Sequence, residues 1–243
     1  MKSVPDASQT AASKRKNSTF FRDNIGTYSS SVQELDTYAR IRSSVDQSLK
    51  GVETLLDIGN GGVFDYDTAR VPRIVALDLF LDQLPDSYQC PPNVILRTGS
   101  ALAVPEPDCA FDGVLMVMLL HHLIGKTVQE SQDNVRQAFT EAWRVLKPGG
   151  KLVIVESCIP AWFYQMEKLV FRVTAPLINR LIEHPATLQY PPQDVAMLMH
   201  EVTGVAPQIT KIPVGKWVLQ FGFKVPSAIT PVCPYLFVLR KST

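Results

Sequence analysis

The sequence predicts an α/β fold built on a parallel sheet of about seven strands, with helices on both faces. Short apolar runs alternate with stretches of helical spacing, which is the pattern of parallel strands joined by crossover helices. The first run ends in an aspartate and a cluster of glycines, as expected for a tight turn at a sheet edge. The chain has 243 residues, of which 46% are hydrophobic, and this is enough to bury one full core.

The chain before the first strand divides into a tail and a helical region. Residues 1–19 are rich in Ser, Thr, Ala and Lys, and we expect a disordered tail there. Residues 20–50 have the spacing of one or two amphipathic helices, which we expect to form a helical cover. The apolar positions of that pattern are Val32, Leu35, Ala39, Ile41, Val45 and Leu49.

Strands and a helix are expected in order through the next hundred residues. The apolar runs predict strands at 54–58, 74–77, 93–97, 113–119 and 151–156. Residues 128–146 place apolar side chains on one face of a helix, and Lys147-Pro148-Gly149-Gly150 is a strong signal for its end. These elements form the predicted parallel part of the sheet.

The alternation breaks after the fifth predicted strand. Residues 158–190 form an aromatic-rich insertion, which we interpret either as a lid over the sheet edge or as a core helix packed on the sheet. A helix near 193–202 and strands around 208–212 and 235–239 follow. We therefore expect one domain over residues 51–243, with the insertion as its lid.

Composition excludes several classes of protein. Lys and Arg number 24 against 23 Asp and Glu, so the net charge of +1 gives no electrostatic basis for binding nucleic acid. The four cysteines include no C-x-x-C pair, so we expect no metal site, no disulfide framework and a reduced, cytoplasmic setting. Charged residues interrupt the apolar stretch 151–182, and we expect no membrane-spanning helix.

The most informative motif is Leu55-Leu56-Asp57-Ile58-Gly59-Asn60-Gly61-Gly62. Glycines directly after a buried strand let the backbone approach a ligand closely. Phe64 stands where a dinucleotide-binding loop has its third glycine, and Asp57 precedes the first glycine by two residues, so the motif differs from that loop. Asp78 ends the next predicted strand, where a carboxylate can accept both hydroxyl groups of a ribose. We expect a nucleoside-containing ligand at this edge.

Further motifs follow in a fixed order: Ala76-Leu77-Asp78, Thr98-Gly99-Ser100-Ala101, Phe111-Asp112-Gly113-Val114-Leu115, His121-His122-Leu123 and Arg144-Val145-Leu146-Lys147-Pro148-Gly149-Gly150. Together with the first motif they resemble the class I S-adenosylmethionine-dependent methyltransferases, closest to the group of ubiquinone/menaquinone-type and natural-product enzymes. The resemblance covers about residues 50–158. It implies a Rossmann-like fold with S-adenosylmethionine as cofactor and S-adenosylhomocysteine as product, and it says little about the substrate.

The resemblance also implies cofactor contacts at matching positions. The turn of Gly59, Asn60 and Gly61 would pass under the methionine part of the cofactor, with Asp57 holding its amino group. The other implied contacts are Asp78 to the ribose, Leu79 to adenine, Ser100 or the Ala101 backbone to the adenine amino group, and the Met118 carbonyl. The serine stands where the family usually has an acid.

Two residues of the helical cover are further candidates. Tyr28 and Arg42 would close over the cofactor and pair with its carboxylate. Alternatively, they are solvated polar residues of ordinary amphipathic helices.

The segment after the glycine turn departs from the family pattern. It lacks a further glycine and is short for a crossover, so we expect the first crossover helix to be truncated or displaced. Residues 64–67 would then lie near the reactive sulfonium, with Phe64 and Tyr66 contacting the substrate and Asp65 or Asp67 orienting it. In the alternative interpretation, Asp67 caps a helix and Asp65 is solvated.

Residues for the methyl acceptor are expected at two places. His121 and His122 follow the fourth predicted strand, and a neutral imidazole there would take a proton from an oxygen or ammonium acceptor near pH 7. Each is a candidate catalytic base, with loop anchoring as the alternative. Trp162, Phe163 and Met166 in the insertion are candidates for an apolar substrate pocket.

We therefore expect a methyltransferase that acts on a small, hydrophobic metabolite in natural-product biosynthesis, as a monomer or homodimer. The acceptor atom can be O, N or C. Three alternatives stay open: an enzyme that uses the same cofactor for cyclisation or rearrangement, a nonenzymatic cofactor-binding protein, and a nicotinamide oxidoreductase, which Phe64 disfavours.

Overall fold

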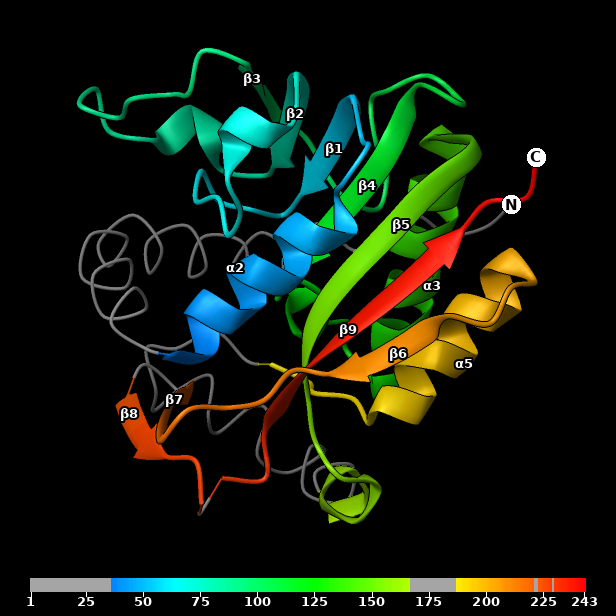
Figure 1. Cartoon of the computed structure of the whole chain (residues 1–243). Coiled ribbons are helices and arrows are strands. Elements are labelled where there is room, and N and C mark those ends of the chain that lie inside the picture. The colour runs from blue at the N-terminus through cyan, green and yellow to red at the C-terminus, as the bar shows by residue number, and fades with distance from the viewer. Residues whose placement is uncertain (1–35, 167–186, 221–222, 229) are drawn as a thin grey trace.

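The computed structural model describes residues 36–166, 187–220, 223–228 and 230–243. Seven strands form one sheet in the order β3-β2-β1-β4-β5-β9-β6 (Figure 1). The five strands from β3 to β5 pair in parallel, and β9 and β6 add an antiparallel edge. The strands are β1 (Thr54–Ile58), β2 (Arg73–Asp78), β3 (Val94–Thr98), β4 (Phe111–Val117), β5 (Leu146–Cys158), β6 (Gln208–Lys211) and β9 (Cys233–Arg240). The predicted, mostly parallel sheet of about seven strands is confirmed.

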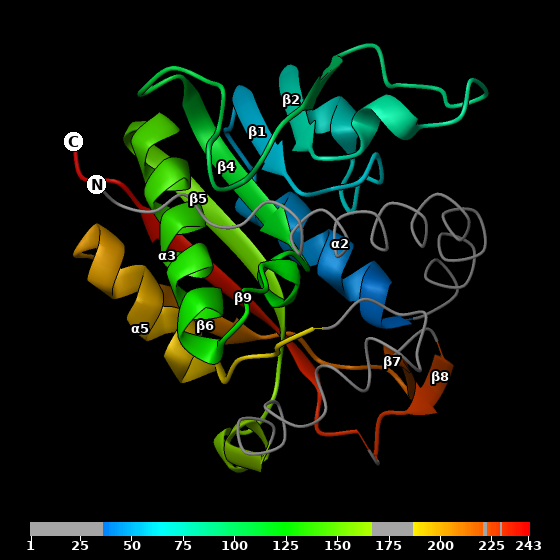
Figure 2. The ribbon, with the colours of Figure 1, turned by 180° about the vertical axis from the view of Figure 1, so that it is seen from behind.

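Helices cover the sheet from both sides. In Figure 1 α2 lies in front of the sheet, and in Figure 2 α3 and α5 lie in front of the opposite face. The helices are α2 (Asp36–Ser48), α3 (Val128–Val145) and α5 (Pro192–Thr203), with the 3-10 turns η1 (Thr68–Arg70), η2 (Leu81–Gln83) and η3 (Leu120–His122).

Successive residues of the central strands enter two different cores, because side chains alternate between the faces of a sheet. Leu55 of β1 packs in the core under α2, which buries Ile41 and Val45. The next residue, Leu56, packs in the core under α3 and α5, together with Phe139 of α3. The central strands are apolar on both faces, as expected for a buried parallel sheet.

The connections from β1 to β2 and from β2 to β3 contain only the single turns η1 and η2. The expected truncation of the first crossover helix is therefore confirmed. Asn93, just before β3, holds this region together, because its Nδ2 donates to the carbonyl oxygens of Thr68 and Val71, each at 2.7 Å.

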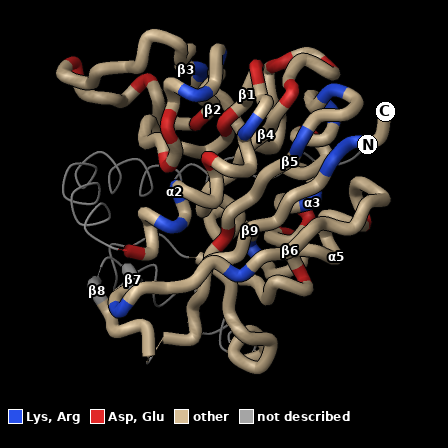
Figure 3. The backbone as a smooth tube through the Cα atoms, viewed as in Figure 1, with Lys and Arg blue, Asp and Glu red and all other residues tan. Residues whose placement is uncertain are grey.

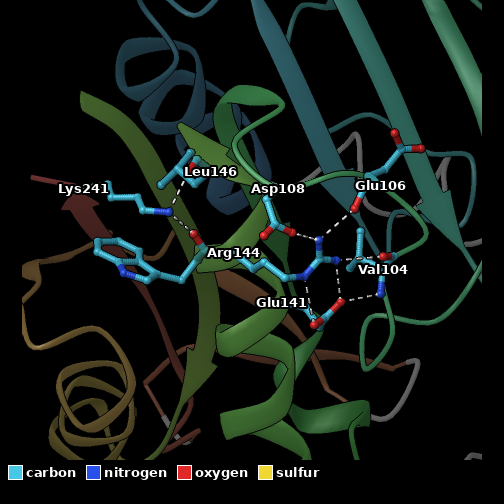
Figure 4. A network of polar contacts seen from close by, with 8 residues as sticks. Val104, Glu106, Asp108, Glu141, Arg144, Leu146 and Lys241 are labelled. Atoms are coloured by element: carbon cyan, nitrogen blue, oxygen red, sulfur yellow. Dashed lines mark hydrogen bonds and ion pairs between the residues drawn. The ribbon is translucent and has the colours of Figure 1, made fainter. Parts of the chain in front are cut away.

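The loop from β3 to β4 is fixed by one guanidinium group at the end of α3 (Figure 4). Arg144 donates to the carbonyl oxygens of Val104 and Glu106, both at 2.9 Å, and pairs with Asp108 and Glu141. Figure 4 also shows Lys241 beside Leu146 at the end of α3. The Lys241 Nζ donates to the carbonyl oxygens of Trp143 and Leu146, for which no N–H donor follows in the helix.

Two strands were missing from the sequence prediction. β7 (Trp217–Gln220) and β8 (Phe223–Pro226) form an antiparallel hairpin. The Thr37 hydroxyl connects the hairpin to the start of α2, since it accepts from the Gly215 N–H at 3.0 Å and donates to the Trp217 carbonyl at 3.3 Å. Figure 1 places this hairpin and the helical residues 161–166 at the edge toward which β1, β4 and β5 point.

Some predicted elements lie outside the described residues, and one strand begins earlier than predicted. The tail and the first part of the helical cover, within residues 1–35, and the middle of the predicted lid, 167–186, lie outside the described residues. Among the helices that are described, none combines the length and apolarity needed to cross a membrane. β5 begins at Leu146, earlier than the predicted start at 151, because Leu146 already pairs with Phe111 of β4.

Candidate active site

The glycine turn that the sequence predicted after β1 has a left-handed backbone. Gly59, Gly61 and Gly62 have φ values of 79°, 58° and 86°, which residues with a side chain rarely adopt. The Gly59 N–H donates to the Leu77 carbonyl at 2.7 Å, so the turn is attached to the end of β2. A Cβ at Gly61 would have no atom within 4 Å, which leaves space for a ligand above the turn.

Asp57 is held beneath this turn by two donors. Asn60 Nδ2 donates to Asp57 Oδ2 at 2.8 Å, and the Tyr66 hydroxyl donates to the same oxygen at 3.0 Å. Asn60 also accepts from the Gly62 N–H at 2.9 Å, so one side chain joins the acid to the turn. Burial raises the pKa of Asp57 to about 7, although both hydrogen bonds oppose the shift.

Asp78 reaches the same turn from the end of β2. The Gly61 N–H donates to Asp78 Oδ2 at 3.1 Å, and the Phe80 N–H donates to Oδ1 at 3.0 Å. Burial raises the pKa of Asp78, and the backbone N–H donors lower it. Figure 3 shows acidic positions close together around the ends of β1 and β2.

The segment from Phe64 to Asp67 has mixed outcomes. Asp67 Oδ1 accepts from the Ala69 N–H at 3.2 Å, so the predicted capping role is confirmed for the short turn η1. Asp65 is not solvated as that alternative expected, since it is partly buried and burial raises its pKa. The charge of Arg42 opposes this shift, and its Nη2 lies 3.5 Å from the Phe64 carbonyl oxygen.

Tyr66 differs from its predicted place at the substrate. Its side chain is only 3% exposed, and its hydroxyl supports Asp57. Phe64 packs against it edge to face, with ring centroids 5.9 Å apart, and is partly exposed. The geometry thus makes Tyr66 a support of Asp57 beneath the glycine turn, while Phe64 stays a candidate for substrate contact.

The end of β4 approaches the glycine turn from the other side. Met118 has a φ of 52°, a strained value for a residue with a side chain, and its N–H donates to the Val155 carbonyl at 2.8 Å. Leu119 then lies directly on Gly59, where a Cβ would be 2.5 Å from Leu119 Cδ1. This close approach explains why glycine is needed at that position of the turn.

His121 has a partner that the sequence analysis missed. Its Nδ1 lies 2.6 Å from Oε1 of Glu156, a fully buried residue of β5, and the His122 ring is 4.1 Å away between centroids. In the sequence, Glu156 is visible only as an acid at the end of the apolar run 151–156. The pairing of β5 with β4 is what places this acid near His121. The predicted histidine pair therefore lies at the same sheet edge as the glycine turn.

The predicted adenine contacts lie beyond β2 and β3. Leu79 is 36% exposed and presents apolar surface next to Asp78. Ser100 Oγ accepts from the Leu102 N–H at 3.1 Å, which leaves its O–H free to donate elsewhere, and Ala101 packs against the core.

The described start of the insertion exposes part of its aromatic face. Trp162 and Met166 are 62% and 57% exposed and stand one helical turn apart, whereas Phe163 packs partly against the core. Tyr164 between them is buried. The insertion start thus combines a core contact with an exposed apolar surface. Tyr28 lies outside the described residues.

These residues fit S-adenosylmethionine. The two Asp78 oxygens accept from backbone N–H groups, and a carboxylate with about four lone-pair sites retains capacity for a ribose hydroxyl. Gly61, whose N–H donates to Asp78, borders open space. Leu79, the residue after Asp78, has an exposed side chain. The set therefore offers acceptors for the sugar and an apolar surface for a base.

Comparison with known proteins agrees with this fit. A family model described as "Methyltransferase domain" matches residues 56–154. The demethylmenaquinone methyltransferase of Tropheryma whipplei is 31% identical over 146 residues, which cover 57% of this chain and 56% of that protein. Residues 56–154 therefore match the methyltransferase family, in agreement with the resemblance seen in the sequence. A methyltransferase of Encephalitozoon cuniculi is 36% identical over 96 residues, 40% of each chain, so this chain spans about half the length of these curated relatives.

Solved structures share the fold of the methyltransferase domain. The 1,6-didemethyltoxoflavin-N1-methyltransferase of Burkholderia thailandensis, with 1,6-didemethyltoxoflavin and S-adenosylhomocysteine bound, has a TM-score of 0.64 at 15% identity, covering 100% of this chain and 93% of that one. Human N-acetylserotonin methyltransferase with S-adenosylmethionine has a TM-score of 0.55 at 14% identity, covering 86% and 52%. At these identities the solved structures show a shared fold, and the predicted Rossmann-like methyltransferase fold is confirmed.

Proposed function

We propose that this chain transfers a methyl group from S-adenosylmethionine to a small, hydrophobic metabolite. One observation carries the proposal: two carboxylates, Asp57 and Asp78, are bonded to a single left-handed glycine turn at the carboxyl edge of the sheet. Acceptors at this place suit the amino and hydroxyl donors of the cofactor. The matched methyltransferase domain supports the same cofactor.

Each residue then has a defined task. Asp78 accepts from the ribose hydroxyls, and Leu79 packs on the adenine ring. The Ser100 O–H donates to a ring nitrogen, in place of the acid that would accept from the amino group. Asp57 and the Met118 carbonyl accept from the amino group of the methionine part. The bound cofactor supplies a methyl group activated by its sulfonium charge, and the protein holds the acceptor in line with it.

A small, hydrophobic acceptor is supported by what surrounds this edge. The exposed side chains of Trp162 and Met166 lie on the helical residues 161–166, at the edge toward which the parallel strands point (Figure 1). With Phe64 beside the turn, they would form an apolar wall against an acceptor. The relatives named above include proteins named for demethylmenaquinone, 1,6-didemethyltoxoflavin and N-acetylserotonin.

Calorimetry with S-adenosylhomocysteine tests the cofactor site. Asp78→Ala should weaken binding by about 100-fold, because two hydrogen bonds to a charged group are lost. Asp86→Ala is the matched control, since it removes an equal charge from an exposed position in the next loop, and it should bind as the parent chain does. Equal affinity of the Asp78→Ala variant and the parent chain would refute the proposed site.

Product release tests the reaction. S-adenosylhomocysteine should form with at least one acceptor from a panel of phenols, terpenoids and amines. Cofactor binding with conversion of an acceptor, but without that product, would instead support cyclisation or rearrangement. Binding with no turnover across the panel would support a nonenzymatic cofactor-binding protein.

A further inference from the structure

Glu156 is a buried carboxylate surrounded by N–H groups. It is fully buried, and its Oε2 accepts from the Leu120 N–H at 2.7 Å. Its Oε1 accepts from the Ser157 N–H at 2.7 Å and lies 2.6 Å from His121 Nδ1. An ionised carboxylate accepts on both oxygens, so His121 Nδ1 carries the proton in this contact. The other ring nitrogen, Nε2, is then left without a proton and can accept one.

The strand arrangement places this pair beside the cofactor turn. Glu156 lies in β5 and His121 in η3, after the neighbouring strand β4, although 35 residues separate them in the chain. Leu119, two residues before His121, packs directly on Gly59. The His121 side chain is 14% exposed, so part of it is accessible at this edge.

Three other titratable groups lie around the pair. The His122 ring is the immediate neighbour of His121, and the Cys158 thiol and Tyr190 hydroxyl face Glu156. Burial raises the pKa of both Cys158 and Tyr190, so these groups are neutral near pH 7. Glu156 is therefore the anion that fixes the tautomer of His121.

We propose that Glu156 is a positioning residue that makes His121 Nε2 the general base of methyl transfer, and that the acceptor is therefore a hydroxyl of phenol type. This inference rests on the proposed function. The hydroxyl oxygen forms a bond to the methyl carbon as the methyl–sulfur bond breaks, and the hydroxyl proton passes to His121 Nε2. The sulfonium becomes a neutral thioether, and the positive charge ends on the imidazolium of His121 beside Glu156. The imidazolium later releases its proton to water.

A carbon acceptor already bearing a carbanion, or a thiolate, would need no such base. A phenol, with an ordinary pKa of about 10, is largely protonated at neutral pH and gains from one. An ammonium acceptor would also need a base, but the hydrophobic acceptor of the proposed function is uncharged, so the inference takes a hydroxyl as the acceptor.

Glu156→Gln tests the positioning role. Glutamine keeps the shape but has one acceptor oxygen, so either the Leu120 N–H loses its acceptor or an NH₂ group faces His121 Nδ1. The second arrangement moves the imidazole proton to Nε2 and removes the base. We expect the rate of transfer at saturating cofactor to fall about 100-fold, while the affinity for S-adenosylhomocysteine measured by calorimetry stays unchanged. Glu201→Gln, at an exposed ion pair with Arg136, is the control and should keep full activity.

Nuclear magnetic resonance of ¹⁵N-labelled histidine provides a measurement that does not depend on turnover. The parent chain should show His121 protonated at Nδ1 near neutral pH. If His121 is protonated at Nε2 there, the inference is overturned, whether or not any variant folds. Glu156→Gln should shift the signal toward the Nε2–H form.

Acceptors of graded acidity separate a base from a merely structural role. Phenols that are already ionised at the assay pH should react almost equally with the parent chain and with Glu156→Gln and His121→Gln, whereas weakly acidic phenols should lose about 100-fold. If cofactor binds and phenols are methylated but both variants lose the same factor with every phenol, this inference fails and the proposed function survives. If the parent chain binds no cofactor, both fail.

Discussion

β1, β2 and β3 are joined by loops with only the single turns η1 and η2, whereas β4 and β5 are joined by the 18-residue helix α3. In the first half of the sheet, side-chain hydrogen bonds to nearby groups hold the site, such as Asn60 to Asp57 three residues away. In the second half, apolar packing of α3 holds the strands, and the key polar contact joins His121 to Glu156 across 35 residues.

The difference identifies where the site is sensitive. A loop without an apolar face is stabilised by directed bonds to main-chain oxygens, as Asn93 and Arg144 show. Each such bond can be lost through one substitution. The stability of the first half of the sheet, which carries the glycine turn, should therefore respond strongly to polar and glycine substitutions and to pH.

A substitution at the contact between the two halves, where Gly59 meets Leu119, should give the largest effect on stability. Gly59→Ala introduces a Cβ 2.5 Å from Leu119 Cδ1 at a φ of 79°, so it adds both a clash and backbone strain. We expect a loss of about 4 kcal/mol in the free energy of unfolding, measured in urea, from overpacking and strain together. Gly51→Ala is the control, because Gly51 has nearly the same φ of 77° but no atom within 4 Å, and it should cost only about 1–2 kcal/mol.

A second substitution locates the cost. Leu119→Ala in the Gly59→Ala background should recover part of the stability, because it removes the clashing atoms but leaves the strain. Full additivity of the two substitutions would show that the halves do not meet at this contact.

Asp57→Asn should give the second-largest effect on the free energy of unfolding, and this effect should depend on pH. Because the pKa of Asp57 is raised to about 7, the folded chain holds a proton between pH 4 and 7 that the unfolded chain has released. Stability of the parent chain therefore falls as pH rises through this window, by about 3 kcal/mol. The asparagine variant lacks this loss, so its stability relative to the parent should increase from pH 4 to pH 8. A constant difference in urea midpoints across that range would contradict the raised pKa.

Arg144→Ala should cost about 2 kcal/mol, because the main-chain carbonyls of Val104 and Glu106 lose their donor. Arg136→Ala is a close control: the two side chains are 30% and 31% exposed, but the contacts described for the Arg136 guanidinium are to the side chains of Asp133 and Glu201. Its loss should cost less than about 1 kcal/mol. Equal costs in urea unfolding would mean that the loop between β3 and β4 does not depend on bonds to its main chain.

The same comparison explains what the sequence could predict. Asp57, Gly59 and Gly61 lie within five residues, so the turn and its chemistry follow from a short motif. The partner of His121 could not be found this way, because only the pairing of β4 with β5 places Glu156 beside it. Likewise, the β7–β8 hairpin depends on contacts with α2 near Thr37 and not on a strong turn signal of its own.

Tyr66→Phe should give the smallest effect and tests whether the Asp57 carboxylate is truly held by its neighbours. The hydroxyl donates to Asp57 Oδ2 at 3.0 Å and lowers the pKa of that acid, so its removal should raise this pKa further. The variant should therefore lose about 1 kcal/mol more stability at pH 8 than at pH 4. Tyr88→Phe is the matched control, since its hydroxyl donates at 2.8 Å to the Gly62 carbonyl, which does not titrate, and its cost should be the same at both pH values. If both tyrosines gave costs independent of pH, the hydroxyl of Tyr66 would serve packing alone, and the local polar bonds of the first half would not control the charge on its central acid.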